Sequence, residues 1–396
     1  MAFDNVYIPI PHIWSTPFTK WQGALAEVNA LDLAVDVTAR ALEQRETSPE
    51  LFTHWALGMT VIQKHSFYGV TLVTRRLGAG EVAGPWISRA CATSAAVVDH
   101  LATQVQLGRH RATLGVLTDR TSNAPLMIYP SPRGMGGAPQ TEHWMLDNFS
   151  LDPTTGQSML DTAENTARDG GFTREQVDEL TLLRNEQYQR ALANDRAFQR
   201  RYMVDIHIPG RKGTTVLTED TGVFPTTAEG LAALRPATEG GVTTFGSQTH
   251  PADAAAGIAV TDRDTARELN GGGATAQILG TGFGRAEPAF MPKAPVRAAA
   301  QALDDAGLTL DAIDLVTTHN PFAVNDLWFA HETGYDLERM NIYGSSLVYG
   351  HPQAPTGARA IAELIHALHE RGGGYGLFVG CAAGDDAGGL VIKVDG

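Results

Sequence analysis

The sequence predicts an α/β protein made of two similar halves, with an insertion in the first. The composition, with 43% hydrophobic residues, 42 glycines and no low-complexity tract in 396 residues, is typical of a globular α/β protein. A chain of this length can bury a large core and is expected to form two or three lobes. Helical and strand-like periodicities alternate, and one succession of them recurs late in the chain.

The first half is predicted to comprise residues 1–118 and 242–270. Its first strand is expected over residues 6–10. Pro9 has no N–H to donate to a neighbouring strand, so this strand should either lie at the edge of the sheet or end near Pro9. The rhythm of apolar residues then predicts a helix over 31–44, a strand over 55–61, a helix over 91–107, a strand over 112–117, a strand over 251–260 and a helix over 262–269.

Residues 119–241 differ in character and are predicted to form an inserted loop lobe. The capping box Thr173-Arg174-Glu175-Gln176 opens a charged helix. Positive charge gathers in this lobe, although the chain carries a net charge of −14; the residues are Arg184, Arg190, Arg196, Arg200, Arg201, Arg211 and Lys212. Such a run is typically a solvated face, and the alternative is a surface that receives a phosphorylated carrier.

The second half, residues 271–396, repeats the pattern of the first. Its predicted elements are a strand over 275–282, a helix over 295–306, a strand over 313–318, a helix over 356–370 and a strand that leads to Cys381. When residues 41–58 are laid over 302–319, Cys91 falls on Pro352, beside His351. Both positions open an apolar helix, so two facing halves would bring two helix N-termini together.

Several classes of protein are disfavoured by composition. The acidic balance disfavours a nucleic-acid surface. Two cysteines cannot make a disulfide framework and match no zinc spacing, so we predict no metal site. The first residues lack the pattern of a signal peptide, and no window holds about 18 uninterrupted apolar residues, so we expect a cytoplasmic protein without a membrane span.

The two cysteines and His351 lie at predicted strand–helix junctions, which suggests acyl transfer through a cysteine. At the start of a helix, Cys91 would face unpaired N–H groups and the positive end of the dipole, which can lower the pKa of its thiol. The alternative for Cys91 is a small buried hydrophobe.

Five motifs, spread over essentially the whole chain, resemble those of the thiolase family. They are Ser88-Arg89-Ala90-Cys91-Ala92-Thr93-Ser94, Thr162-Ala163-Glu164-Asn165, His319-Asn320-Pro321-Phe322-Ala323, Gly350-His351-Pro352 with Thr356-Gly357-Ala358-Arg359, and Gly373-Gly374-Tyr375-Gly376 leading to Cys381. The set of two cysteines and two histidines is specific, since condensing enzymes of the ketoacyl synthase type lack the second cysteine.

The resemblance implies a five-layer αβαβα fold and an acyl-CoA C-acyltransferase. Such an enzyme cleaves a 3-oxoacyl-CoA by thiolysis, or runs the reverse Claisen condensation, through an acyl-cysteine. Coenzyme A is then a substrate, and no cofactor is implied. The resemblance also implies a homodimer or homotetramer, in which we expect the strand over 112–117 to pair across a two-fold axis.

The resemblance assigns four catalytic positions. Cys91 would attack the acyl carbonyl, with His351 placed to take its proton. Cys381 would exchange a proton with the α-carbon of the acetyl group. His319 would stabilise the enolate or oxyanion, and the N–H groups of Cys91 and Ala383 would form a second oxyanion hole.

The substrate lining departs from the family pattern. Thr249 replaces a serine that meets the pantetheine arm, Asn320 replaces a glutamate, and Phe322 and Ala383 complete the residues expected to contact substrate. The altered positions expected at the acyl and pantetheine channels are Thr93, Thr249, Gln353 and Pro355. They predict an unusual acyl-CoA, branched or cyclic, and the alternative is neutral drift in a generalist.

Two other functions are compatible with the sequence. One is a thiolase-like acyltransferase whose acceptor is not acetyl-CoA. The other is a non-catalytic acyl-CoA-binding subunit of a larger complex. The intact set of two cysteines and two histidines argues against the second, because a binding subunit has no need of them.

Overall fold

The computed structural model describes residues 3–122 and 124–395 of the chain. The strands are β1 (Tyr7–Pro9), β2 (Ile13–Ser15), β3 (Thr19–Lys20), β4 (His54–Gly58), β5 (Trp86–Ile87), β6 (Ala112–Arg120), β7 (Leu126–Tyr129), β8 (Gln140–His143), β9 (Ile206–Gly210), β10 (Gly213–Leu217), β11 (Ala252–Thr261), β12 (Thr275–Arg285), β13 (Leu315–His319), β14 (Gly374–Ala382) and β15 (Asp386–Val394). The helices are α1 (Ala30–Gln44), α2 (Val70–Arg76), α3 (Thr93–Gln106), α4 (Leu146–Ser150), α5 (Met159–Asp169), α6 (Arg174–Arg196), α7 (Ala228–Ala232), α8 (Arg263–Leu269), α9 (Ala294–Ala306), α10 (Ala323–Thr333), α11 (Ser346–Tyr349) and α12 (Pro355–Glu370).

The two halves meet along the first strand. The main sheet runs β13-β14-β15-β12-β1-β11-β6-β4-β5, with β2 and β3 also paired to β11. β1 is antiparallel both to β12 of the C-terminal half and to the end of β11 of the N-terminal half. The N-terminal half contains two parallel pairs, β4 with β6 and β4 with β5, and the C-terminal half contains one, β13 with β14.

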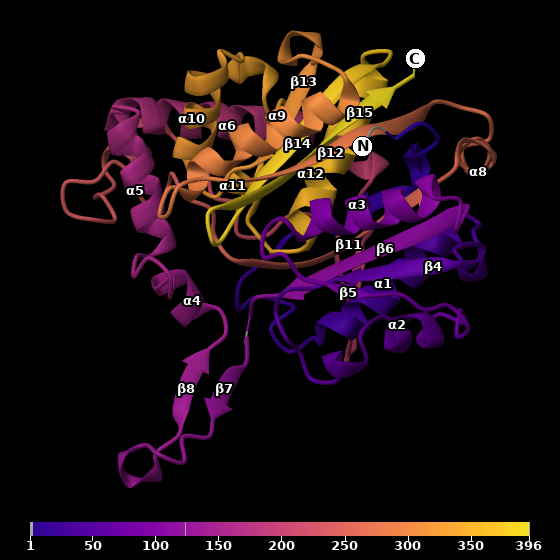
Figure 1. The fold of residues 1–396 in the computed structure, drawn as a ribbon, viewed down its shortest axis with the longest axis horizontal. Coiled ribbons are helices and arrows are strands. Elements are labelled where there is room, and N and C mark those ends of the chain that lie inside the picture. Colours follow the sequence, from indigo (N-terminus) through magenta and orange to yellow (C-terminus); the bar gives the residue numbers. More distant parts are fainter. Residues whose placement is uncertain (1–2, 123, 396) are drawn as a thin grey trace.

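Helices cover both halves and also fill the space between them (Figure 1). α1 packs on β11 and β6 at one outer face, and α9 packs on β12 and β15 at the other. α3 and α12 contact each other and touch strands of both halves. The result is the αβαβα order of layers, which confirms the predicted fold class.

The central layer explains the sequence of α12. Every residue from Pro355 to Leu368 is buried, because one side of the helix meets α3 and the other sides meet strands of both halves. Such a position suits a helix whose side chains are mostly apolar or small, and its charged residues Arg359 and Glu363 are paired with each other. Pro355 stands in the first turn, where its missing N–H costs nothing and its φ suits the helix.

The inserted segment carries α4 to α7 and the hairpins β7–β8 and β9–β10, and the first hairpin projects from the body (Figure 1). α5 and α6 pack against α10 of the C-terminal half. Arg184 on α6 was expected on a solvated or phosphate-binding face, and that expectation is wrong. Its guanidinium is fully buried and pairs with Asp326 of α10 at 2.9 Å.

The expectation that residues 112–117 pair across a two-fold axis is also wrong. β6 lies between β11 and β4, so both of its edges are already paired within the chain. The N-terminal half ends instead at β5, which pairs with β4. Among the described residues, no helix is both long enough and apolar enough to cross a membrane.

Candidate active site

Cys91 lies in a tight turn that leads into α3. Ala90 before it has φ +44°, and Thr93 fixes the turn by donating to the Ala90 carbonyl at 2.7 Å and accepting from the Arg89 N–H at 2.8 Å. Arg89 in turn forms two hydrogen bonds with Asp386 of the other half. The nucleophile turn is therefore held by both halves. Thr93, expected at the acyl channel, serves the turn instead.

His351 lies opposite Cys91, between α11 and α12. Its Nε2 is 3.1 Å from Sγ of Cys91, and its Nδ1 is 2.7 Å from Oγ1 of Thr356 in the first turn of α12. When Nδ1 donates to Thr356, Nε2 presents its lone pair to the thiol. The geometry is that of a nucleophile, a base and a group that orients the base.

Gln353 adds a second acceptor at the sulfur. It has φ +63°, and its Oε1 accepts from the Cys91 thiol at 3.3 Å. The next residue, Ala354, donates its N–H to Asp119, a buried carboxylate that also accepts from the N–H groups of Thr60 and Val61. Burial raises the pKa of Asp119 to about 7. This carboxylate therefore fixes the loop that presents Gln353.

His319 lies at the end of β13 and stacks on His351, with ring centroids 4.0 Å apart and planes 25° apart. Its Nδ1 is 2.8 Å from Oγ of Ser346, and its buried Nε2 has no hydrogen-bond partner among the residues that the structure describes. Asn320, beside it, is fully buried; its amide donates to Asp326 at 2.6 Å and accepts from the Leu347 N–H at 3.2 Å. The replacement of glutamate at this position thus concerns packing rather than the cavity.

Cys381 lies near the end of β14 and is fully buried. The side-chain amide of Asn325 donates to its sulfur at 3.2 Å. The thiol packs in an apolar cluster with Ala163, Met291 and Phe322. Burial in this apolar cluster raises the pKa of the Cys381 thiol well above the ordinary value, although the Asn325 amide and the N–H of Cys381 oppose the rise.

The protonation of the reacting pair differs from the sequence expectation. Burial raises the pKa of Cys91 to about 12, although the N–H groups of Ala383 and of Cys91 itself oppose the rise. Burial also lowers the pKa of His351 to about 3. Desolvation therefore outweighs the helix N-terminus that was expected to favour the thiolate, and the resting pair is neutral.

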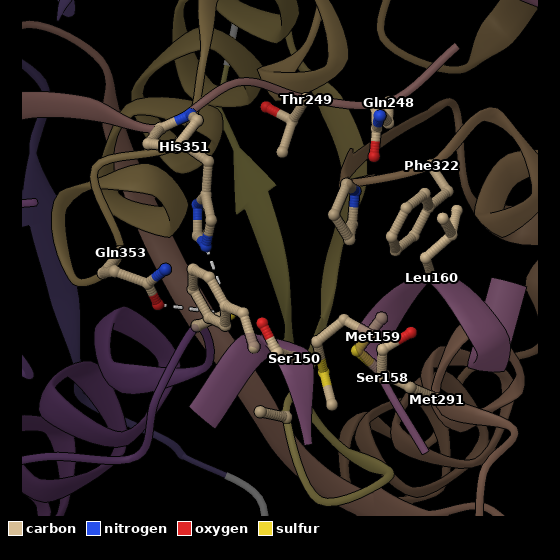
Figure 2. A pocket seen from close by; sticks show the side chains of 15 residues that line it. Ser150, Ser158, Met159, Leu160, Gln248, Thr249, Met291, Phe322, His351 and Gln353 are labelled. Atoms are coloured by element: carbon tan, nitrogen blue, oxygen red, sulfur yellow. Dashed lines mark hydrogen bonds between the residues drawn. The ribbon is translucent and has the colours of Figure 1, made fainter. Parts of the chain in front are cut away.

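Cys91 and His351 face a cavity of about 440 Å³ (Figure 2), whereas His319 and Cys381 are outside its described lining. Thr249, Phe322 and Ala383, which are expected to contact substrate, line this cavity, whereas Pro355 is outside its described lining. The whole lining is Cys91, Phe149, Ser150, Ser158, Met159, Leu160, Gln248, Thr249, Pro251, Met291, Pro321, Phe322, His351, Gln353 and Ala383. The hydroxyl of Thr249 donates to the Ser346 carbonyl at 2.5 Å, so its methyl group faces the cavity.

Sequence reasoning missed the apolar wall made by Met159, Leu160 and Met291. The signal for the first two is the capping box of Ser158 with Asp161, which places apolar side chains in the first turn of α5. That turn immediately precedes the Thr162–Asn165 motif. Met291 follows a short loop and carries no comparable signal.

Known proteins resemble the chain over its full length. Family models described as thiolase N-terminal domain and thiolase C-terminal domain match residues 10–264 and 273–394. An acetyl-CoA acetyltransferase of Escherichia coli is 29% identical over 96% of both chains, and a 3-ketoacyl-CoA thiolase of Erwinia tasmaniensis is 30% identical over 98% of this chain and 97% of its own. The crystal structure of human mitochondrial 3-ketoacyl-CoA thiolase superposes with a TM-score of 0.90 at 26% identity, covering 99% of both chains. The chain therefore belongs to the thiolase family.

Proposed function

We propose that this chain is an acyl-CoA C-acyltransferase that carries the acyl group on Cys91. The observation that carries the proposal is the 3.1 Å contact between Sγ of Cys91 and Nε2 of His351 at the floor of a largely apolar cavity. The substrate is a 3-oxoacyl-CoA cleaved by the thiol of coenzyme A, or two acyl-CoA molecules in the reverse direction. A human relative of known structure is described as a complex with CoA, which supports CoA as a substrate here.

In the first step, Sγ of Cys91 attacks the 3-oxo carbonyl while the thiol proton passes to Nε2 of His351. The neutral pair keeps the thiol protonated until a carbonyl arrives, so charge develops only in the transition state. The N–H groups of Cys91 and Ala383, which already point at the sulfur, lie where they can also stabilise the oxyanion.

Collapse of the tetrahedral intermediate breaks the bond between the α- and β-carbons. The departing enolate of acetyl-CoA takes the proton of Cys381, which leaves a thiolate there and an acyl group on Cys91. Coenzyme A then attacks the acyl group and its thiol proton restores Cys381. Cys91 leaves as a thiolate and recovers its proton from His351, which closes the cycle.

His319 can adopt the tautomer that stabilises the enolate oxygen. Oγ of Ser346 lies 2.8 Å from Nδ1 of His319 and 3.3 Å from Oδ1 of Asn320, so the one hydroxyl proton can serve either acceptor. When Ser346 donates to His319, the unpartnered Nε2 carries the ring proton and can donate to an oxyanion.

The cavity wall supports an acyl group bulkier than acetoacetyl. Met159, Leu160, Met291 and Phe322 offer apolar contact, while Gln353 places an amide beside the nucleophile. Each extra buried methylene is worth about 0.8 kcal/mol, so two give about a tenfold preference. A profile of kcat/KM that peaks at acetoacetyl-CoA would point to the generalist instead.

Mass spectrometry of the intact chain and its peptides, after incubation with a panel of acyl-CoA donors, tests the function. We expect an acyl mass on the peptide that contains Cys91, absent in Cys91→Ser, and its transfer to coenzyme A or acetyl-CoA. Acyl mass only on Cys381, or none during turnover, would overturn the proposal. Binding without acylation would favour the non-catalytic subunit, and acyl-Cys91 that neither acceptor discharges would favour a different acceptor.

We further propose that the chain works as a homodimer or a larger homo-oligomer. β5 ends the sheet of the N-terminal half. Gly69 lies beside this strand, since a Cβ atom added to Gly69 would be 3.5 Å from Cβ of Trp86 in β5. Phe67 and Tyr68, next to that glycine, are 90% and 67% exposed. A strand edge flanked by exposed aromatic rings is a surface that association would cover.

A further inference from the structure

Cys91, His319 and His351 form a second kind of constellation besides a catalytic one. One nitrogen of each histidine and the sulfur of Cys91 all lie within 4.8 Å of one another. All three residues are buried, and Cys91 and His351 line the cavity. They come from three distant segments, so the spacing of residues along the chain could not reveal them as a ligand set.

Nε2 of His319, which the mechanism offers to the enolate oxygen when substrate is bound, also points to a ligand in the free enzyme. The side chain of His319 is fully buried, yet Nε2 has no hydrogen-bond partner among the described residues. A buried polar atom without a partner is costly, and its position in this cluster leaves a donor atom available for an ion.

A hydroxyl group lies behind each ring and can fix which ring nitrogen carries the proton. The two rings are stacked with their planes 25° apart, so they must turn slightly for both Nε2 lone pairs to meet at one ion. Nδ1 of His319 meets Ser346, and Nδ1 of His351 meets Thr356. If Ser346 gives its own proton to Asn320, it accepts from Nδ1 of His319, and Nε2 then carries a lone pair. Metal-binding histidines are commonly oriented through the second ring nitrogen in this way.

The chemistry of the three donors selects the ion. One thiolate and two imidazoles suit Zn²⁺ and similar borderline cations, whereas Mg²⁺ and Ca²⁺ require oxygen ligands. Three protein ligands leave a fourth position, and the cavity gives it room for water. Nε2 of His351 and Sγ of Cys91, now 3.1 Å apart, need to separate only slightly to accept an ion between them.

We propose that Cys91, His319 and His351 capture Zn²⁺, or a cation of the same chemical class, as an inhibitory site. The ion would bond to Sγ of Cys91 and to Nε2 of each histidine, and the thiol proton would leave to solvent. The same sulfur cannot then attack a carbonyl. This inference goes beyond the proposed function, because binding can be measured without any acyl-CoA.

Titration with Co²⁺, followed by absorption spectroscopy, tests the site in the full chain. We expect one Co²⁺ per chain, a thiolate-to-cobalt charge-transfer band in the near ultraviolet, and displacement of the ion by Zn²⁺. Cys91→Ala should lose the band. His319→Ala should weaken binding by at least about tenfold, since even loss of an outer-shell partner costs about 10–100-fold.

Two controls separate this site from others in the chain. His54 and His100 approach each other at 2.9 Å between their Nε2 atoms, and a Co²⁺ ion there would give no thiolate band. Cys381→Ala should leave the band in place, because that thiol is outside the cluster. Loss of the band in Cys381→Ala, or its survival in Cys91→Ala, would overturn the proposal.

A measurement on the unaltered chain avoids any folding defect of the variants. Zn²⁺ should block alkylation of Cys91 by iodoacetamide, and EDTA should restore it. Unchanged alkylation at saturating Zn²⁺ would overturn the proposal. Neither result depends on whether Cys91 accepts an acyl group.

Discussion

At Cys91 and His351 two opposing influences act on the same proton. The turn before α3 supplies N–H groups that favour a thiolate, and burial between the two halves favours the thiol. Desolvation prevails, so the imidazole remains neutral across the ordinary range of pH. Reactivity then has to come from the substrate, whose carbonyl accepts the charge that the sulfur gives up.

The neutral pair predicts a steep pH profile for alkylation. Since the pKa of Cys91 is raised to about 12, the thiolate fraction should grow about tenfold per pH unit from neutral pH upward. The rate of iodoacetamide attack, measured on the peptide that contains residue 91, should follow that slope. A plateau that begins below neutral pH would indicate a thiolate–imidazolium pair instead.

Cys381 predicts a separation of the two half-reactions. Cys381→Ala should still accept an acyl group on Cys91 from an acyl-CoA donor, because only the carbon–carbon step requires the second proton carrier. Condensation and thiolysis should fall by about 10²–10⁴-fold. Acylation followed by mass spectrometry and turnover followed by absorbance distinguish these steps. Equal loss of both would assign Cys381 a structural role through its contact with Asn325.

The motifs that resemble the thiolase family located the reacting residues, but they could not predict the electrostatics of the site. The motifs led to Cys91, His319, His351 and Cys381, and folding brings the first three of them together. The pKa of Cys91 depends on burial between segments about 260 residues apart, which no local pattern contains. The inward turn of Asn320 likewise depends on its partner Asp326 in α10.

Among the elements, the short helix α4 separates two cavities. Phe149 and Pro251 line both the reactive cavity and a neighbouring one of about 420 Å³, and Leu146 lines only the neighbour. The second cavity is mostly apolar, with Trp21 and Met145 among its walls. The ring of Phe149 therefore limits how far an acyl chain can extend beyond the nucleophile.

Phe149→Ala should open one cavity into the other and favour longer acyl chains. Two methylenes that reach the second cavity would raise kcat/KM about tenfold relative to acetoacetyl-CoA, at about 0.8 kcal/mol each. Leu146→Ala, which alters only the second cavity, is the matched control and should leave the short-chain rates unchanged. An identical chain-length profile in Phe149→Ala and the parent would contradict this prediction.

The limits of the helices were predicted well where apolar residues follow a clear pattern, either along one face or around the whole helix. The limits of α1, α9 and α12 lie within two residues of those expected. β15 was missed because its pairing with β14 and β12 is defined by distant partners, and the β7–β8 hairpin because its strands expose apolar residues to solvent. β6 was misplaced in an interface because local periodicity does not distinguish a central strand from an edge.

In the whole molecule, a buried ionic cluster fastens the inserted lobe to the central layer. Arg359 of α12 pairs with Asp220 of the inserted segment at 2.6 Å and with Glu363 at 3.0 Å, and its guanidinium lies 3.6 Å from the ring of Tyr349. These charged groups are almost entirely removed from solvent. Each therefore depends on the others for compensation.

Arg359→Met should lower the free energy of unfolding by about 3–5 kcal/mol, because it leaves two carboxylates buried without their partner. Urea denaturation measures the change. The matched control is Arg190→Met, whose exposed contact with Glu338 spans 3.9 Å and should contribute about 0–1 kcal/mol. Similar losses in the two variants would show that burial of the pair is not what matters.

The last prediction concerns the free edge of β5 and the aromatic residues beside it. An exposed strand edge next to Phe67 and Tyr68 would remain open in a monomer, so we expect a stable dimer at micromolar concentration. Phe67→Glu should weaken it, because a dimer that buries this ring would also bury a charge. Light scattering and sedimentation measure the mass of the parent and of Phe67→Glu.

The control is Leu107→Glu, which also replaces an exposed apolar residue but lies at the far end of α3. This variant should stay dimeric. A monomeric parent would contradict the assembly, and a Phe67→Glu dimer as stable as the parent would place the interface on another surface, such as the projecting β7–β8 hairpin.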